Sequence, residues 1–343
     1  EAACRPGEVL VGDGTWRLTR ATVRYDELGE LPMRGKAEPV PTYQVVSAGR
    51  FDDDGPTPFV GREAELSRIR SIYDRVVDDR VARLVSIIGS PGVGKTRLAR
   101  EFTASVSGEA RIVEMRCRRS GTATFAPIAE VLRATVDVGD GQDPQAIAEA
   151  LLGLVDHLDD GERVAGLLST FLDDGSNRST EEAFYAVRRL AEAMATERPV
   201  VVIVDDIQWA EPLFLDLLDH LADWVVDAAV LIITSSRPEV RDVRPSFAVE
   251  SRTVEAVVQL DGLDERETAE LARRLIGSGS LPPGLVERLP TSTEGNPLFV
   301  RELMKTLVDD GVIVQVDGAW ELTVEAESVE VPPTIQSLLA ARV

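Results

Sequence analysis

One stretch of eight residues, Gly89-Ser90-Pro91-Gly92-Val93-Gly94-Lys95-Thr96, constrains this chain more than any other. It matches the pattern G-x-x-x-x-G-K-[ST] of a phosphate-binding loop, or P-loop. The β-prone residues 84–88 precede it and the helix-like residues 96–102 follow it, which is the context that the pattern requires. The alternative is a Gly/Pro-rich surface turn before an ordinary helix, and the flanking elements argue against it.

The residue types of this loop suit nucleotide phosphates. Its glycines let the backbone N–H groups turn inward, so that a phosphate can lie at a helix N-terminus. The Lys95 ammonium group is expected to reach the β- and γ-phosphates, and the Thr96 hydroxyl to bind Mg²⁺. Lys95 is therefore also a candidate catalytic residue. The candidate nucleotide-binding residues of the loop are Gly89, Pro91, Gly92, Val93, Gly94, Lys95, Thr96 and Arg97.

A second landmark is the run Pro-Val-Val-Val-Ile-Val-Asp-Asp at residues 199–206. An unbroken β-branched run predicts a buried parallel strand, and this one ends in two carboxylates. Downstream of a P-loop, we expect Asp205 to bind Mg²⁺ and Asp206 to act as a catalytic residue near the attacking water. The alternative is that the two acids merely follow a strand, as acidic residues often do.

Residues 229–238 predict another buried strand, which ends at Arg237. We expect Arg237 to sense the terminal phosphate as a catalytic residue; a solvent-exposed arginine at a strand end is the alternative. Residues 111–116 and 254–260 predict two further strands, and helical patterns separate the strands. The sequence therefore predicts an α/β fold with a parallel sheet and helices on both faces. Ligands in such sheets bind at the carboxyl ends of the strands, where all these candidates fall.

We expect five regions along the chain. Residues 1–48 are β-type pieces broken by Gly and Pro, and they are too few to bury a core of their own. Residues 49–58 are a linker, residues 59–262 the P-loop core, residues 263–311 a helical lid, and residues 312–343 the start of a winged-helix-like unit. In this last region we expect a small hairpin of residues 312–314 and 320–323, and a helix that starts at Pro332. Because the chain lacks an initiator Met and its last residues have a helical pattern, we expect it to be a fragment of something longer.

Net charge and cysteine usage limit the expected binding partners and the expected cellular compartment. The net charge of −22 argues against direct binding of nucleic acid or of an anionic membrane by this segment. No apolar run is long enough to span a membrane. Cys4 and Cys117 are far apart in sequence, which fits a reducing compartment, so we expect a cytoplasmic location.

Six landmarks occur in a fixed order along residues 59–343. They are Phe59-Val60-Gly61-Arg62-Glu63, Gly89 to Thr96, Val204-Asp205-Asp206-Ile207-Gln208-Trp209-Ala210-Glu211-Pro212, Ser236-Arg237-Pro238, Gly295-Asn296-Pro297-Leu298-Phe299 and Val331-Pro332-Pro333-Thr334. With these motifs, residues 59–343 resemble the STAND class of P-loop ATPases (signal-transduction ATPases with numerous domains), as in large LuxR-type regulators and multidomain bacterial adenylate cyclases. The resemblance implies that Val60, Gly61, Arg62 and Pro297 flank the adenine and ribose, and that Arg237 is the sensor residue.

The resemblance also implies an activity. Such a module is a slow ATPase that works as a switch: ADP holds a closed resting form, and exchange for ATP opens it toward homo-oligomers. The expected cofactors are ATP or ADP and Mg²⁺. The second acid of the 199–206 run is Asp206 and not a glutamate, which suits slow turnover.

In the first region, residues 5–11, 28–31 and 34–43 form a distinctive set of short motifs. With them, this region resembles the C-terminal end of a class III adenylate/guanylate cyclase domain. In that family the metal-binding carboxylates lie upstream of this point, so this fragment is not expected to cyclise a nucleotide. The expected partners are the nucleotide, the chain's own cyclase domain and a missing C-terminal sensor region.

Three functions compete. The first is a nucleotide-operated ATPase switch in a multidomain regulator of the adenylate-cyclase type, and the cyclase-like tail favours it. The second is the ATPase module of a LuxR-type DNA-binding transcription regulator. The third is a non-hydrolysing, nucleotide-bound scaffold, against which the intact lysine, threonine and paired acids argue.

Overall fold

The chain divides into two compact units, Glu1–Pro58 and Phe59–Val343, which are described separately. The computed structural model describes residues 9–12, 15–16, 24–31, 40–47, 57–119, 124–136, 144–172, 179–277, 281–316 and 319–323. Within these residues, no helix combines the length and the apolar composition that a membrane crossing requires.

The first unit is a small antiparallel sheet. Strand β3 (Val40–Ser47) lies between β1 (Leu10–Gly12) and β2 (Arg24–Leu31). The Trp16 ring stacks on the Tyr43 ring of β3, with 4.6 Å between the ring centroids. The β-rich character predicted for this region is confirmed in the described residues.

The second unit is built on a five-stranded sheet, whose neighbouring strands all pair in parallel. Its order is β5-β6-β7-β4-β8, so the strand that precedes the P-loop is flanked on both sides. Residues 84–88 of that strand are completely buried, as a central strand requires. The predicted parallel sheet is therefore confirmed. The strands are β4 (Ala82–Gly89), β5 (Arg111–Arg116), β6 (Val200–Asp205), β7 (Val230–Ser236) and β8 (Val254–Leu260).

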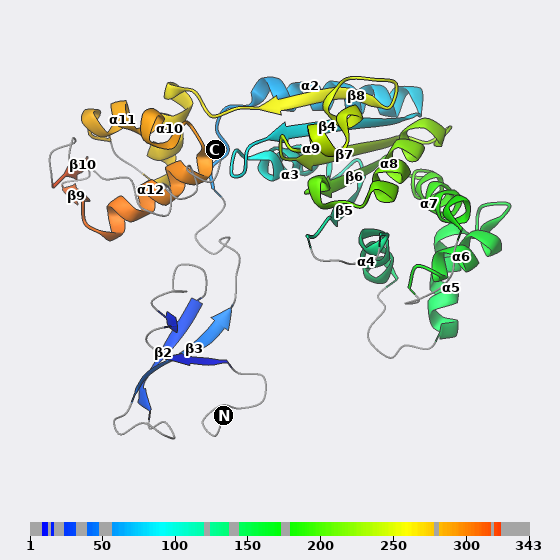
Figure 1. The fold of residues 1–343 in the computed structure, drawn as a ribbon, viewed down its shortest axis with the longest axis horizontal. Helices are drawn as coiled ribbons and strands as arrows, with labels where there is room; N and C mark the ends of the chain where they lie inside the picture. Colours follow the sequence, from blue (N-terminus) through cyan, green and yellow to red (C-terminus); the bar gives the residue numbers. More distant parts are fainter. Residues whose placement is uncertain are drawn as a thin grey trace. The chain divides into compact units, whose positions relative to one another are not determined.

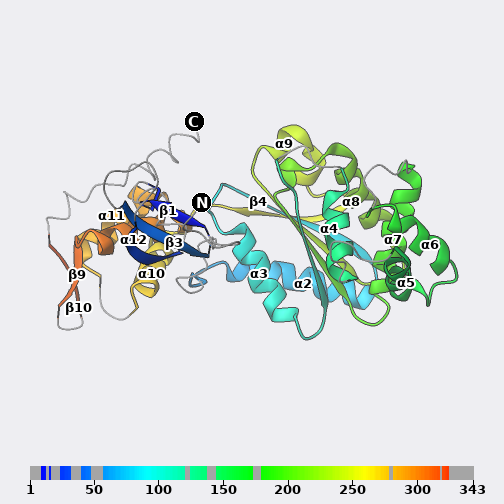
Figure 2. The ribbon, with the colours of Figure 1, turned by 90° about the horizontal axis from the view of Figure 1, so that it is seen from below.

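Helices cover both faces of this sheet because alternate residues of each strand point to opposite sides. Val85 and Ile87 pack in one apolar cluster with α2 (Glu63–Asp79) and α3 (Lys95–Val106), whereas Leu84 and Ile88 belong to the cluster on the other face. The two layers are visible in Figures 1 and 2. The second face carries α4 (Ala126–Thr135), α5 (Pro144–Val155), α6 (Gly161–Ser169), α7 (Thr180–Met194), α8 (Pro212–Trp224), α9 (Val240–Val243) and the 3₁₀ turn η2 (Pro245–Ala248).

Three further helices form a separate group, which we call the lid. They are α10 (Glu265–Leu275), α11 (Pro283–Thr293) and α12 (Pro297–Asp309), and they share an apolar cluster of their own. Figure 1 shows the lid at the opposite end of the unit from α5, α6 and α7. A hairpin of β9 (Ile313–Val316) and β10 (Ala319–Leu322) follows, where the sequence predicts one. The helix predicted from Pro332 lies outside the described residues.

Candidate nucleotide-binding site

The P-loop joins β4 to α3, and its glycines are required by its geometry. Gly92 and Gly94 have φ angles of 80° and 102°, in the left-handed region that favours glycine. A Cβ atom on Gly92 would also lie 2.8 Å from the Asn296 side chain, and one on Gly89 would lie 2.7 Å from the Leu260 carbonyl oxygen. The loop is therefore closely packed between β8 and the lid.

Lys95 is the first residue of α3 and is buried, with 8% of its surface exposed. Its Nζ donates hydrogen bonds to the carbonyl oxygens of Gly89 and Ser90, at 2.8 and 3.0 Å. Burial lowers the pKa of the ammonium group, and the charges of Asp205 and Asp206 oppose that shift. An ammonium group held by neutral carbonyls keeps its charge available for an anion.

Thr96 and Asp205 meet although they are 109 positions apart in the sequence. The Thr96 hydroxyl lies 3.1 Å from Asp205 Oδ2, and the Ser235 hydroxyl of β7 donates to the other carboxylate oxygen. If the Thr96 hydrogen is used on Asp205, the Thr96 lone pairs stay available to a cation. One hydroxyl and one carboxylate, with phosphate oxygens and water, are ligands that Mg²⁺ accepts, so the residues present fit this metal. The sequence did not predict the bond from Ser235 to Asp205, because Ser235 is one of several polar residues at the end of its strand.

Asp206 follows β6 with a φ of 61°. Aspartate is one of the few non-glycine residues that adopt this left-handed conformation readily. Arg116, at the end of β5, donates to Asp206 Oδ2 from Nε and Nη2 at 3.1 and 2.8 Å, and Gln208 donates to Oδ1 at 2.9 Å. Both oxygens of the predicted catalytic carboxylate are therefore engaged. The sequence did not predict these contacts of Arg116 and Gln208. Arg116 is 90 positions from Asp206, and a glutamine two positions after an aspartate need not bond to it.

Arg237 lies at the end of β7 and reaches the same edge of the sheet. Its backbone N–H donates to the Gln208 side chain at 3.1 Å, and its guanidinium carbon lies 5.7 Å from the centre of the Trp209 ring. Trp209 belongs to the 3₁₀ turn η1 (Ile207–Trp209), which follows β6. The Arg237 charge also contributes to the lowered pKa of Lys95, so the two cations are near each other.

The lid is hydrogen-bonded to the P-loop. Asn296, the residue before α12, is 1% exposed and donates from Nδ2 to the Pro91 carbonyl oxygen at 2.9 Å. The Leu298 N–H lies 3.3 Å from the Gly92 carbonyl oxygen and 3.1 Å from Asn296 Oδ1. Pro297 therefore begins α12 directly beside the loop. The sequence predicts a turn at residues 295–297, within one of the six motifs, but no contact for the Asn296 side chain. The available signal was its place before a proline at a helix start.

The segment Val60-Gly61-Arg62 lies against the lid. Val60 packs on the lid's apolar cluster, and a Cβ atom on Gly61 would meet the Glu267 carboxylate of α10. The Arg62 guanidinium donates to the Asp261 carbonyl and, at 3.1 Å, to Glu65. This segment is thus placed by the lid and by the end of β8.

Arg97 differs from the other loop candidates. It pairs with Glu101 at 3.1 Å, and its guanidinium carbon lies 5.9 Å from the centre of the Phe59 ring. The structure therefore groups Lys95, Thr96, Asp205 and the two residues that follow β6 and β7 at one edge, while the Arg97 side chain contacts α3 and the residue that precedes Val60.

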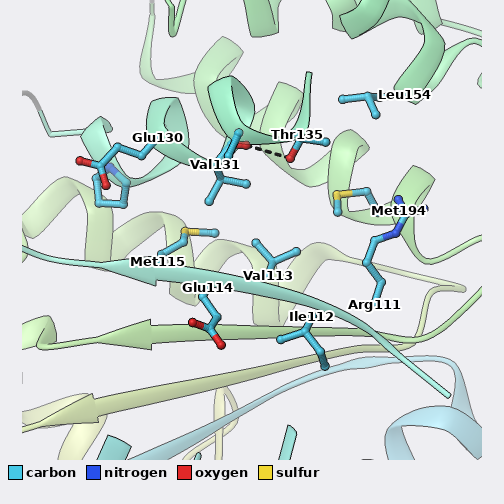
Figure 3. Close-up of a pocket in the computed structure, with 12 residues that line it drawn as sticks. Arg111, Ile112, Val113, Glu114, Met115, Glu130, Val131, Thr135, Leu154 and Met194 are labelled. Carbon is cyan, nitrogen blue, oxygen red and sulfur yellow. Dashed lines mark hydrogen bonds between the residues drawn. The ribbon is translucent and has the colours of Figure 1, made fainter. Parts of the chain in front are cut away.

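A cavity of about 690 Å³ lies elsewhere, beside the edge strand β5. Figure 3 shows Val113 and Met115 pointing from β5 toward Val131 of α4. None of the predicted site residues lines it.

A parallel α/β sheet with a P-loop, a carboxylate hydrogen-bonded to the P-loop threonine and an arginine directly after the intervening strand defines a P-loop ATPase. The chain belongs to the AAA ATPase domain family, whose model matches residues 58–233. A second family model, described as a domain of unknown function, matches residues 264–319, which include the lid helices.

A curated relative is an uncharacterized protein of Rhizobium meliloti (strain 1021), 28% identical over 320 residues. The match covers 88% of this chain and 31% of the relative, so the chain spans about a third of the relative's length.

Solved structures with a similar fold include the Thermotoga maritima RuvB Holliday junction branch migration motor, at 14% identity and a TM-score of 0.42, covering 83% of this chain and 72% of that chain. The Aeropyrum pernix Orc1 protein in complex with DNA has 14% identity and a TM-score of 0.48, covering 84% and 66%. Cdc6p from Pyrobaculum aerophilum has 13% identity and a TM-score of 0.45, covering 76% and 66%.

Proposed function

We propose that this chain is a STAND-class switch, which binds Mg-ATP or Mg-ADP and hydrolyses ATP slowly to control oligomerisation or output. The observation that carries the proposal is the contact between the lid and the P-loop through Asn296 and Leu298. These bonds end on the carbonyl oxygens of Pro91 and Gly92. A change in the conformation of the loop on nucleotide exchange would therefore shift the start of α12 directly. A nucleotide could then move the lid, which is what a switch requires.

The binding roles follow from the residues at the edge. Lys95 would exchange its two carbonyl partners for phosphate oxygens, with little desolvation left to overcome because it is already buried. Thr96 and Asp205 would hold Mg²⁺, which neutralises phosphate charge when it is bound. The P-loop backbone N–H groups would orient the phosphates at the N-terminus of α3.

Slow hydrolysis is the expected consequence of the contacts of Asp206. A carboxylate that accepts hydrogen bonds at both oxygens, two of them from one guanidinium group, has little capacity left to accept a proton from water. Release from Arg116 would be needed before Asp206 acts as a base. The same contact favours the second candidate function, a nucleotide-bound scaffold that does not hydrolyse ATP.

The parent protein is part of the proposal. The cyclase-like motifs of residues 1–48 and the greater length of the relative support a multidomain regulator of the adenylate-cyclase type, with the chain's own cyclase domain and a sensor region as partners. A LuxR-type parent would differ in the domains joined to this module, and the net charge of −22 argues against DNA contact by the module itself.

The test is the nucleotide content of the purified protein, measured by denaturation and chromatography. Retained ADP, and a rise in mass by light scattering after exchange into Mg-ATP, are the results expected for a switch. A protein that retains ADP but never releases phosphate from added ATP would be the scaffold. A protein that neither retains nor binds either nucleotide contradicts the proposal.

A further inference from the structure

Two arginines share one aromatic ring at the carboxyl edge of the sheet. The guanidinium carbons of Arg119 and Arg237 lie 4.9 and 5.7 Å from the centre of the Trp209 ring. Arg119 follows β5, Trp209 follows β6 and Arg237 follows β7, and these three strands are neighbours in the sheet. Three successive strand ends therefore bring two cations to one indole.

Neither cation has a carboxylate partner among the residues that the structure describes. By contrast, the neighbouring Arg116 is paired with Asp206 at 2.8 Å and Arg118 lies 3.5 Å from Glu130. This is notable in a chain with 59 acidic residues, where an arginine without such a partner is not explained by a shortage of carboxylates. Cation–π contacts hold each guanidinium group only modestly, and the two positive charges repel each other. A bound anion would relieve that repulsion.

The pair is tied to the candidate catalytic acid. The Gln208 side chain donates to Asp206 Oδ1 and accepts from the Arg237 N–H, so one residue links the acid to the arginine. Trp209 is partly buried and packs on the core of the second sheet face, which fixes the ring. The ring is thus a platform at the carboxyl edge of the sheet, next to the candidate catalytic acid.

We propose that Arg119 and Arg237, resting on Trp209, form a clamp for a phosphoryl group. The clamp takes either the γ-phosphate of bound ATP or the inorganic phosphate released from it. The planar guanidinium fork suits phosphate oxygens, and the ring keeps both forks close to their binding position. This assigns Arg119, which no motif singles out, to direct contact with substrate or product. The inference rests on the proposed function, because it requires nucleotide in the P-loop.

The test uses Trp209 as its own reporter. The chain has four tryptophans, and a W16F/W224F/W320F background leaves Trp209 alone. Its fluorescence is titrated with Mg-ATP, with Mg-ADP, with Mg-ADP plus inorganic phosphate and with inorganic phosphate alone, in the parent and in Arg119→Gln. Arg118→Gln is the matched control, since Arg118 is the adjacent arginine, is exposed and faces Glu130.

We expect a Trp209 response to Mg-ATP that Mg-ADP does not give. Arg119→Gln should weaken Mg-ATP about tenfold while leaving Mg-ADP affinity unchanged, and Arg118→Gln should match the parent. A response to Mg-ADP plus phosphate places the released product in the clamp; a response to Mg-ATP alone places the γ-phosphate there.

An unchanged ratio of ATP to ADP affinity in Arg119→Gln, with an unchanged Trp209 response, overturns the clamp alone. A parent protein that binds neither nucleotide overturns the clamp and the proposed function together.

Discussion

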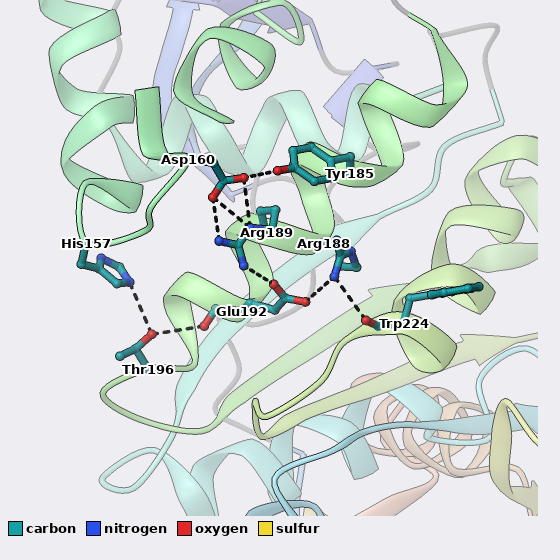
Figure 4. Close-up of polar contacts among 8 residues, drawn as sticks. All are labelled: His157, Asp160, Tyr185, Arg188, Arg189, Glu192, Thr196 and Trp224. Atoms are coloured by element: carbon teal, nitrogen blue, oxygen red, sulfur yellow. Dashed lines mark hydrogen bonds and ion pairs between the residues drawn. The ribbon is translucent and has the colours of Figure 1, made fainter. Parts of the chain in front are cut away.

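Two charged clusters of the second unit use the same residue types in different ways. The first joins α6 and α7: Arg189 donates to Asp160 at 2.6 and 3.1 Å and to Glu192 at 2.7 Å, and the Tyr185 hydroxyl also donates to Asp160 (Figure 4). The guanidinium group of Arg189 is thus saturated by carboxylates. The bond to Arg189 is the main reason that the pKa of Asp160 falls to about 2. Such a cluster stabilises the fold and has little left to offer a ligand.

The second cluster lies at the carboxyl ends of the strands. Its Asp206 is paired with Arg116, but its cations Lys95 and Arg237 have no carboxylate hydrogen-bonded to them among the described residues. Lys95 is held by neutral carbonyls, and Arg237 rests on an aromatic ring. These partners are weaker and can be exchanged for an anion. The comparison teaches that the kind of partner separates a cation that is committed to the fold from one that is available to a ligand.

The comparison predicts the largest effect, a loss of nucleotide affinity, for a substitution of Lys95. Lys95→Ala should weaken Mg-ATP and Mg-ADP binding about 100-fold, because at least two charge-assisted hydrogen bonds to phosphate are lost. Its effect on the melting temperature should be small, since the hydrogen bonds of the ammonium group to the described residues go to the carbonyl oxygens of Gly89 and Ser90 in the loop. Calorimetric titration and thermal unfolding measure the two. An unchanged nucleotide affinity would contradict the assigned role.

A substitution of Asp160 is expected to do the opposite, which is to lower stability without changing nucleotide affinity. Asp160→Asn should lower the free energy of unfolding by about 2 kcal/mol and leave nucleotide affinity unchanged. Among the described residues, the side-chain partners of this carboxylate are Arg189 and Tyr185, and neither belongs to the nucleotide site. Urea unfolding measures the loss. A fall in ATP affinity with stability intact would reverse the comparison.

The Asp160 effect should depend on pH. The folded carboxyl has a pKa of about 2, below the unfolded value of about 3.9, so its stabilising contribution is complete above pH 5. It is lost as the pH falls through 4 toward 2, because the unfolded chain takes up the proton first. The difference in stability between Asp160→Asn and the parent should therefore shrink below pH 4, and a difference that is constant down to pH 2 would exclude this cause.

A smaller effect is expected at Asp205. Asp205→Asn should weaken nucleotide binding about tenfold in Mg²⁺ and much less in a chelator. The amide loses the charge that attracts the metal but can still bond both hydroxyls, one through its oxygen and the other through its NH₂ group. Affinities with and without Mg²⁺ are compared. Equal losses in the two conditions would mean that Asp205 does not bind the metal.

The smallest effect concerns the lid. Asn296→Ala removes the cap of α12 and the bond to Pro91, which should cost about 1 kcal/mol of stability. It should also speed the release of a fluorescent ADP analogue, since the lid loses a direct bond to the P-loop. Asn296→Asp, which keeps the cap but cannot donate to Pro91, separates the two roles. Release at the parent rate in both variants would show that this contact does not control exchange.

Much of the fold follows from local patterns. Residues 111–116 and 254–260 are predicted as strands and form β5 and β8 with the same bounds. The Ser179-Thr180-Glu181-Glu182 sequence predicts a helix start, and the Ser179 side chain caps α7 at the Glu182 N–H. Periodicity and capping act over a few residues, so the sequence displays them directly.

The site is less predictable because its partners are distant in sequence. Lys95, Thr96, Asp205 and the arginine after β7 could be named from motifs, and the topology of a parallel sheet predicts that they share an edge. The hydrogen bonds and ion pairs of these residues could not be predicted from the motifs. By sequence, Arg116 is a strand residue and Asn296 a turn residue. Their partners, Asp206 and Pro91, lie 90 and 205 positions away in the sequence, and only the fold brings each pair together.

The sequence by itself therefore determined the parallel α/β sheet, the P-loop and the identity of the candidate phosphate and metal ligands, because each depends on residue types at short, fixed spacings. Tertiary structure alone decided the strand order β5-β6-β7-β4-β8 and, with it, which side chains meet. That order brings the ends of β5 and β7 to either side of the end of β6. It thereby sets Arg116 on Asp206 and places two arginines on Trp209, contacts that exist only once the sheet has formed.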